Sequence, residues 1–194
     1  LDNGMTVGIS FVLDQGDDTA TTTKATDPFD GHSVSISSDA MGTLVMHGEG
    51  GSSAQGAIDT TAAGDIWDTF DGTTTGTTVS SSSGGADILV YALPSIMDGL
   101  AVSASYSPQQ TNASSATAYA ATYSGVEGLS VSYGVGDVFD SAAGVSADST
   151  TMKASYAIGS FTLAYSNNDF ATSAANLDQE TESYKVSYTV SDAI

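Results

Sequence analysis

The sequence predicts an all-β protein, specifically an antiparallel up-and-down transmembrane β-barrel, and three observations support this fold class. Apolar and small residues alternate in many short runs, as in MTVGISFVLD, where Val7, Ile9, Phe11 and Leu13 share one face. The opposite faces carry mostly Ser, Thr, Gly, Ala and Lys, as a wet lumen wall would. Short turns and longer loops follow one another in regular alternation, which indicates that neighbouring strands pair in chain order.

About ten strands are expected, each from its own alternating run. The clearest bounds are 4–13, 32–39, 43–49, 87–93 and 181–190. The apolar residues that define the strands after the first are, in order, Val34 and Ile36; Leu44 and Met46; Leu89, Tyr91 and Leu93; Leu100, Val102, Ala104 and Tyr106; Tyr119, Ala121 and Tyr123; Leu129, Val131 and Tyr133; Met152, Ala154 and Tyr156; Phe161, Leu163 and Tyr165; and Tyr184, Val186, Tyr188 and Val190.

The connections distinguish a barrel from a soluble sandwich, which needs Greek-key crossings between two sheets. Short turns are expected at Asp39–Gly42, Pro94–Asp98, Ser124–Glu127 and Ala157–Gly159. Longer loops are expected at 14–31, 107–115, 135–148 and 167–181, all at the other end of the strands. Because the wall between them is wet in a barrel, we expect water to satisfy the hydroxyls of Ser103 and Ser105.

Composition excludes several classes of protein. The chain has 23 acidic residues, three lysines and no arginine, for a formal charge of -20, so binding to nucleic acid phosphates is not expected. It has no cysteine, which excludes disulfides and thiolate metal sites. No run approaches the roughly 20 apolar residues of a membrane-spanning helix. Nine tyrosines and six phenylalanines at regular spacing argue against a disordered chain.

Two hairpins resemble those on either side of the constriction loop in Gram-negative general porins. SISSDAMGTLVMHGEGG is similar to the hairpin before that loop, and VYALPSIMDGLAVSASYS to the hairpin after it. YAATYSGVEGLSVSYG and MKASYAIGSFTLAYS resemble later hairpins of the family. The resemblance, of the alphaproteobacterial type, implies a 16-stranded homotrimer of the bacterial outer membrane, in contact with outer-membrane lipid and lipopolysaccharide.

The resemblance also implies an organisation for the chain. Residues 1–194 would be one partial β-barrel domain, with two strands before Leu1 and four after Ile194. The long segment 50–86 would be loop 3, folded into the pore. Porin constrictions usually oppose acidic loop residues to a cluster of basic wall residues, and here only Lys153 and Lys185 lie on expected strands as lumen-facing cations.

Acidic residues of this loop are the predicted pore constriction, because a ring of carboxylates concentrates cations and repels anions. The alternative is a solvated acidic loop that only keeps the protein soluble. Trp67 and Phe70 are expected to anchor the loop to the barrel wall. The predicted constriction residues are Glu49, Asp59, Asp65, Asp68 and Asp71.

Two further roles are predicted from residue types. Tyrosines near strand ends suit aromatic belts at the lipid–water interfaces. Asp65, Asp68 and Asp71 offer hard oxygen ligands for calcium, although their spacing is not that of an EF-hand, and no other cofactor is expected. The predicted belt consists of Tyr91, Tyr106, Tyr123, Tyr133, Tyr156, Tyr165 and Tyr188.

No catalytic constellation is present in the sequence. It contains no G-x-S-x-G elbow, and its two histidines have no third ligand at zinc spacing. The predicted function is passive diffusion of small hydrophilic solutes and ions, with cations favoured. The alternative is an acidic extracellular structural protein, such as a surface-layer, filament or adhesin component, whose apolar face would be buried against protein.

Overall fold

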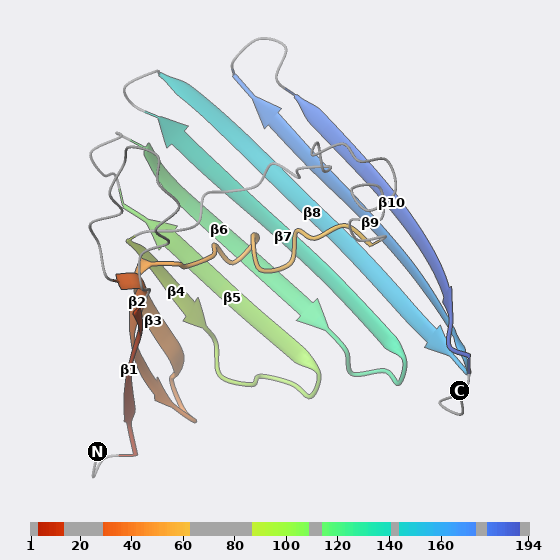
Figure 1. The fold of residues 1–194 in the computed structure, drawn as a ribbon, viewed down its shortest axis with the longest axis horizontal. Helices are drawn as coiled ribbons and strands as arrows, with labels where there is room; N and C mark the ends of the chain where they lie inside the picture. Colours follow the sequence, from red (N-terminus) through yellow and green to blue (C-terminus); the bar gives the residue numbers. More distant parts are fainter. Residues whose placement is uncertain are drawn as a thin grey trace.

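The computed structural model describes residues 4–13, 29–62, 87–108, 114–140, 144–173 and 178–190. It confirms the predicted fold class, because ten antiparallel strands in these ranges form one sheet in which each strand pairs with its neighbour in the chain (Figure 1). The strands are β1 (Thr6–Leu13), β2 (Phe29–Ser38), β3 (Gly42–Glu49), β4 (Ile88–Ala92), β5 (Leu100–Ser107), β6 (Ser114–Tyr123), β7 (Leu129–Asp140), β8 (Val145–Ile158), β9 (Phe161–Thr172) and β10 (Gln179–Tyr188).

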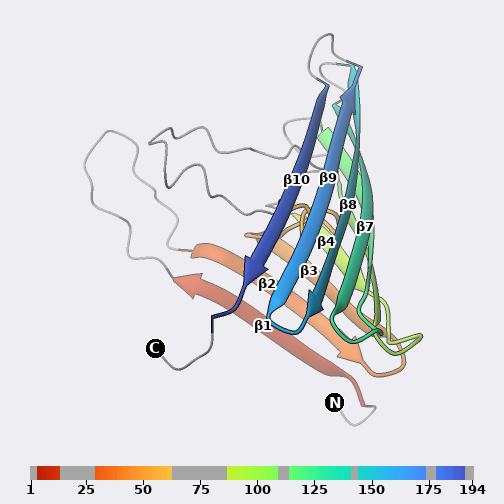
Figure 2. The same ribbon diagram turned by 90° about the vertical axis from the view of Figure 1, so that its right-hand side faces the viewer.

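The sheet is curved (Figure 2), and its two faces differ in the side chains they carry. Large apolar side chains lie exposed on the convex face, with Ile9 at 73% and Val186 at 72% exposure. Cross-strand register keeps them together: Leu129, Tyr156, Leu163 and Val186 occupy successive positions on β7 to β10. The concave face carries small and polar residues, as the alternation predicted.

Several strands are longer than the alternation predicted, so two of the expected long loops are wrong. β7 and β8 pair continuously from Leu129–Tyr156 to Asp140–Val145, which leaves only 141–144 as their connection instead of 135–148. β9 and β10 likewise extend into the expected loop 167–181, and 173–178 connects them. Backbone pairing continues here although acidic residues interrupt the apolar pattern, because ladder hydrogen bonds need no apolar side chains.

The predicted tyrosine belt therefore changes position in part. All seven tyrosines lie on the convex face, but Tyr133 and Tyr165 lie inside β7 and β9 rather than near strand ends. Tyr119 and Tyr184 share that face, at 56% and 68% exposure, and were not among the predicted belt residues. The role of these side chains at a membrane interface stays a prediction.

Close packing between adjacent short turns depends on glycine. Gly128 follows the β6–β7 turn with a φ of 76°, which an L-residue rarely adopts, and a Cβ there would lie 2.4 Å from the carbonyl oxygen of Ala157. The turn after β8 is shorter than expected, because β8 continues to Ile158 and only Gly159 and Ser160 join it to β9.

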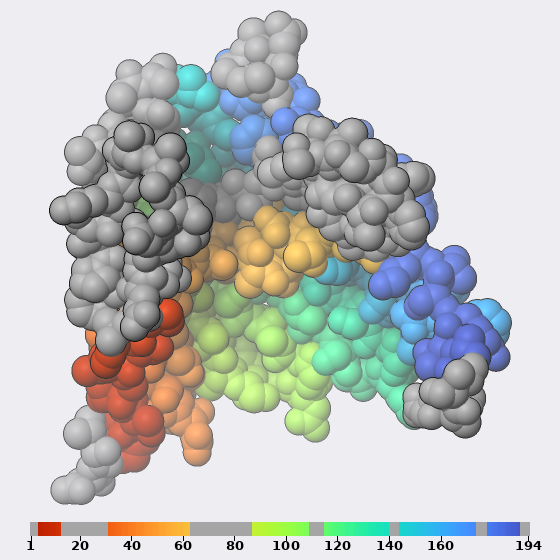
Figure 3. Space-filling view, in the orientation of Figure 1, coloured from red at the N-terminus to blue at the C-terminus, as the bar shows by residue number. Residues whose placement is uncertain are grey.

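Most of the buried residues lie on the concave face, where the chain leaving β3 crosses the sheet. Residues 51–62, here named the crossing segment, run over the strands toward β9 (Figure 1). A space-filling view shows them as an orange to yellow band lying across the strands (Figure 3). Ala54 of this segment packs with Ala118 and Ala120 of β6 in the buried cluster, and Ile58 packs against it. Small wall residues thus let a backbone approach the sheet closely.

Candidate functional site

The crossing segment is built around a tight turn. The Gly56 amide donates to the Ser53 hydroxyl at 2.9 Å, and the Ala57 amide donates to the Ser53 carbonyl at 3.0 Å. The Ile58 amide donates to the Gln55 carbonyl at 2.9 Å. These local bonds satisfy backbone groups of a segment that belongs to neither helix nor strand, so it can lie against the wall without leaving those groups unpaired.

Wall hydroxyls hold the backbone of the crossing segment near both of its ends. The Ala54 amide donates to the Ser105 hydroxyl on β5 at 2.9 Å. The Ala62 amide donates to the Ser166 hydroxyl on β9 at 2.9 Å. The two contacts lie on β5 and β9, which are four places apart in the sheet. The crossing segment therefore spans the concave face and is held by hydrogen bonds near both ends. The hydroxyl of Ser105 thus bonds to protein, and the expectation that water satisfies it is wrong.

Gln55 is the central anchor of the crossing segment and is fully buried. Its amide nitrogen donates to the Thr151 hydroxyl at 3.1 Å, and its amide oxygen accepts from the Ser149 hydroxyl at 2.5 Å. Thr151 donates in turn to the side-chain oxygen of Asn168 at 2.8 Å. Among the described residues, only the Asn168 amide nitrogen is buried without a partner. This network ties the segment to β8 and β9 through buried bonds.

Gly134 of β7 lies directly beneath the crossing segment. A Cβ at this position would lie 2.9 Å from Cδ1 of Ile58 and 3.3 Å from Cγ of Gln55. Nothing in the sequence singles out this residue, because a glycine in a strand facing a lumen needs no partner. In the structure, the missing side chain of Gly134 leaves the space that Ile58 and Gln55 of the crossing segment occupy.

Replacing Gly134 by leucine should displace the crossing segment from the wall, because a large side chain overfills a packed contact at a cost of about 1–3 kcal/mol. Single-channel conductance of the purified variant in planar bilayers should differ from wild type and show more open-state noise. Gly31 of β2 provides a matched control, since a Cβ there would meet only the carbonyl oxygen of Glu49, at 3.8 Å. Unchanged conductance and noise in Gly134→Leu would contradict this packing.

Opposite charges lie near each other where the crossing segment passes β8. The ammonium of Lys153 donates a hydrogen bond to the Thr60 hydroxyl and interacts electrostatically with the Asp59 carboxylate. Lys185 on β10 lies opposite Ala164 and shares the concave face, but it is exposed. Glu49 lies at the end of β3 and is exposed, so of these predicted site residues the structure brings Asp59 and Lys153 together.

The other predicted loop residues lie outside the described residues: Asp65, Trp67, Asp68, Phe70 and Asp71. Their roles in constriction, anchoring and calcium binding stay predictions. Within the described ranges, no group of three or more His, Asp or Glu residues is arranged to hold a metal ion. The same ranges contain no helix long and apolar enough to cross a membrane.

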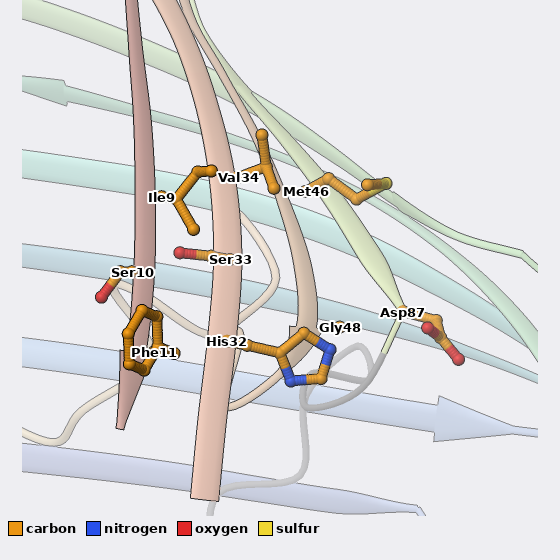
Figure 4. A pocket seen from close by; sticks show the side chains of 9 residues that line it. All are labelled: Ile9, Ser10, Phe11, His32, Ser33, Val34, Met46, Gly48 and Asp87. Carbon is orange, nitrogen blue, oxygen red and sulfur yellow. The ribbon is translucent and has the colours of Figure 1, made fainter. Parts of the chain in front are cut away.

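A depression of about 480 Å³ lies over β1 to β3, away from the crossing segment (Figure 4). Apolar side chains of the convex face form most of its lining, and the His32 ring lies over Gly48. Because its surface is mainly apolar, it does not extend the polar face that the crossing segment covers. Its lining residues are Ile9, Ser10, Phe11, His32, Ser33, Val34, Met46, Gly48 and Asp87.

Comparison with known proteins gives one family. The family model described as Gram-negative porin matches residues 1–194, the whole of the chain. No curated protein matches the chain.

Proposed function

Because this chain belongs to the Gram-negative porin family, we propose that its crossing segment narrows a water-filled, cation-favouring channel for small hydrophilic solutes. Family membership places the protein in the bacterial outer membrane and in a family of channels rather than enzymes. The convex face then meets lipid, and the concave face lines the path of the solute. The alphaproteobacterial type stays a prediction.

The fixed position of the crossing segment on the concave face carries this proposal. A channel wall built only of small residues would leave a wide lumen, and solutes would be selected weakly by size. The segment reduces that width, and its anchors at Ser105, Gln55 and Ser166 keep the reduction constant. Selection would then follow from pore width and from the sign of the lining charge.

The charge of the chain supports a preference for cations. Asp59 lies on the crossing segment itself, and the formal charge of the whole chain is -20. Such a field raises the local concentration of cations at the channel mouth and lowers that of anions. Lys153 opposes Asp59 from the wall, so the preference is expected to be moderate.

Assembly follows the family in this proposal. Porins of this family generally form trimers and pass small solutes. We propose the same homotrimer here, with lipid and lipopolysaccharide covering the convex surface that the copies leave free. The alternative function, an extracellular structural or adhesin protein, requires the apolar face to be buried against protein, and the family match does not favour it.

Replacing Asp59 by asparagine should reduce the cation preference of the channel. One charge about 10 Å from a permeating ion in water contributes roughly 0.4 kcal/mol, favourable for potassium and unfavourable for chloride, so the permeability ratio of potassium to chloride should change about fourfold. Reversal potentials in a KCl gradient across a planar bilayer measure this ratio. Asp98→Asn, at the β4–β5 turn, is the control with the same charge change. A clear anion preference in the wild-type channel would refute the proposal.

A further inference from the structure

A small polar pocket lies between the crossing segment and the wall. Its volume is about 220 Å³, and it is lined by Ala57 and Ile58 of the segment and by four residues of β7 and β8. These four form two cross-strand pairs, Ser130 opposite Ser155 and Ser132 opposite Lys153. One ammonium and three hydroxyls therefore line one compartment, with an apolar surface on the opposite side.

The hydrogen-bond donors of this pocket are only partly used. Ser132 shares a hydrogen bond of 2.8 Å with Thr122, and Lys153 donates one of its three N–H groups to Thr60. Among the described residues, the hydroxyls of Ser130 and Ser155 have no hydrogen-bond partner. A ligand with acceptor oxygens would therefore meet free donors from two neighbouring strands.

We propose that this pocket is a binding subsite for small monocarboxylates, an inference that rests on the proposed channel function. The Lys153 ammonium and an adjacent hydroxyl can both donate to a carboxylate, and hydrogen bonds to charged groups are the stronger ones. Ala57 and Ile58 provide contact for a short apolar body. The pocket volume of about 220 Å³ is large enough for a short solute such as lactate or glycerate.

The neighbouring charge sets the strength of this subsite. Asp59 also interacts with the Lys153 ammonium, so an incoming carboxylate competes with a carboxylate of the protein. Binding is weak as a result, and a channel needs weak binding because a bound solute must leave again. Asp59→Asn should therefore bind lactate more tightly than the wild type.

The test measures block of single-channel current by sodium lactate in dilute KCl, with glycerol as the neutral probe of similar size. Lactate should reduce the wild-type current in a concentration-dependent way, and glycerol should not. Lys153→Gln should weaken the apparent lactate affinity at least about tenfold, and Lys153→Arg should retain most of it. The double variant Ser130→Ala/Ser155→Ala should weaken it about three- to tenfold.

Two controls separate binding from a merely structural role of Lys153. Lys185→Gln makes the same charge change on the same face and should leave the lactate affinity unchanged. Thr60→Val removes the hydrogen bond to the segment but keeps the ammonium, so it should keep most of the affinity. Equal block in wild type and Lys153→Gln, or block by glycerol as strong as by lactate, would overturn the subsite alone. A protein that conducts no KCl current would refute the proposed function, and the subsite with it.

Discussion

Gln55→Ala should loosen the crossing segment and widen the channel. The substitution removes two buried hydrogen bonds, to Thr151 and from Ser149, while Thr151 still donates to Asn168 and Ser149 to the Gly136 carbonyl. A hydrogen bond contributes about 0.5–1.5 kcal/mol net, so the loss of two should weaken the docking of the segment by about 1–3 kcal/mol. The backbone bonds at Ser105 and Ser166 remain, and we therefore expect a mobile segment rather than an unfolded sheet.

The loosened segment should change both the single-channel conductance and the largest solute that permeates. Single-channel conductance should rise with larger fluctuations of the open state, and proteoliposomes should swell faster in sugars too large for the wild type. Ser52→Ala is the matched control, because Ser52 is an exposed residue of the same segment and should behave as wild type. If Gln55→Ala passes the same solutes with the same conductance, the segment does not limit the channel.

The alternation of residues was sufficient to predict the sheet. A one-residue shift of register would move every apolar side chain of a strand to the other face, so the alternation itself constrains how Tyr156, Leu163 and Val186 meet across β8 to β10. The order of the strands followed from the short connections, since a chain that turns within a few residues pairs with its neighbour. These features are local, and local features can be recognised in a sequence.

Strand ends were less predictable, because they depend on pairing rather than on side-chain type. Asp137 of β7 lies directly opposite Asp148 of β8, a like-charge pair that local preference would place in a loop. The strands continue through this pair because the backbone ladder on both sides holds them. The sequence shows the unfavourable side chains but not the hydrogen bonds that outweigh them.

The anchors of the candidate site were the least predictable part. Gln55 lies in a run of Gly, Ser and Ala, and its partners Ser149 and Thr151 lie more than 90 positions further along the chain. Serine and threonine on a lumen wall are expected for their small size alone, so nothing distinguishes those that bond the segment. Asp59 and Lys153 were predicted as individual charges, whereas their proximity required the path of the segment.

Val131→Arg should destabilise the folded protein in the membrane. Val131 lies on the convex face, where register places it between Tyr123 and Ala154, with Leu129 and Tyr133 on the same strand face. An arginine on the lipid-facing surface of a barrel costs about 2–4 kcal/mol at the bilayer midplane and about 0–1 kcal/mol at the interfaces, so at Val131, near the start of β7, the cost should be about 1–2 kcal/mol. Refolding into lipid vesicles at increasing urea concentration should show a lower midpoint for the variant.

Ser130→Arg makes the decisive comparison, because Ser130 precedes Val131 and lies on the concave face. An arginine there has access to water in the channel and should cost far less than the same residue one position later. In the native chain, Lys153 of β8 lies on the concave face and the preceding residue, Met152, lies on the convex face. β8 therefore already tolerates a cation on its inner side. Equal destabilisation by the two substitutions would mean that the convex face does not meet lipid. A lower cation preference of the Ser130→Arg channel would instead support the concave face as the lining of the solute path.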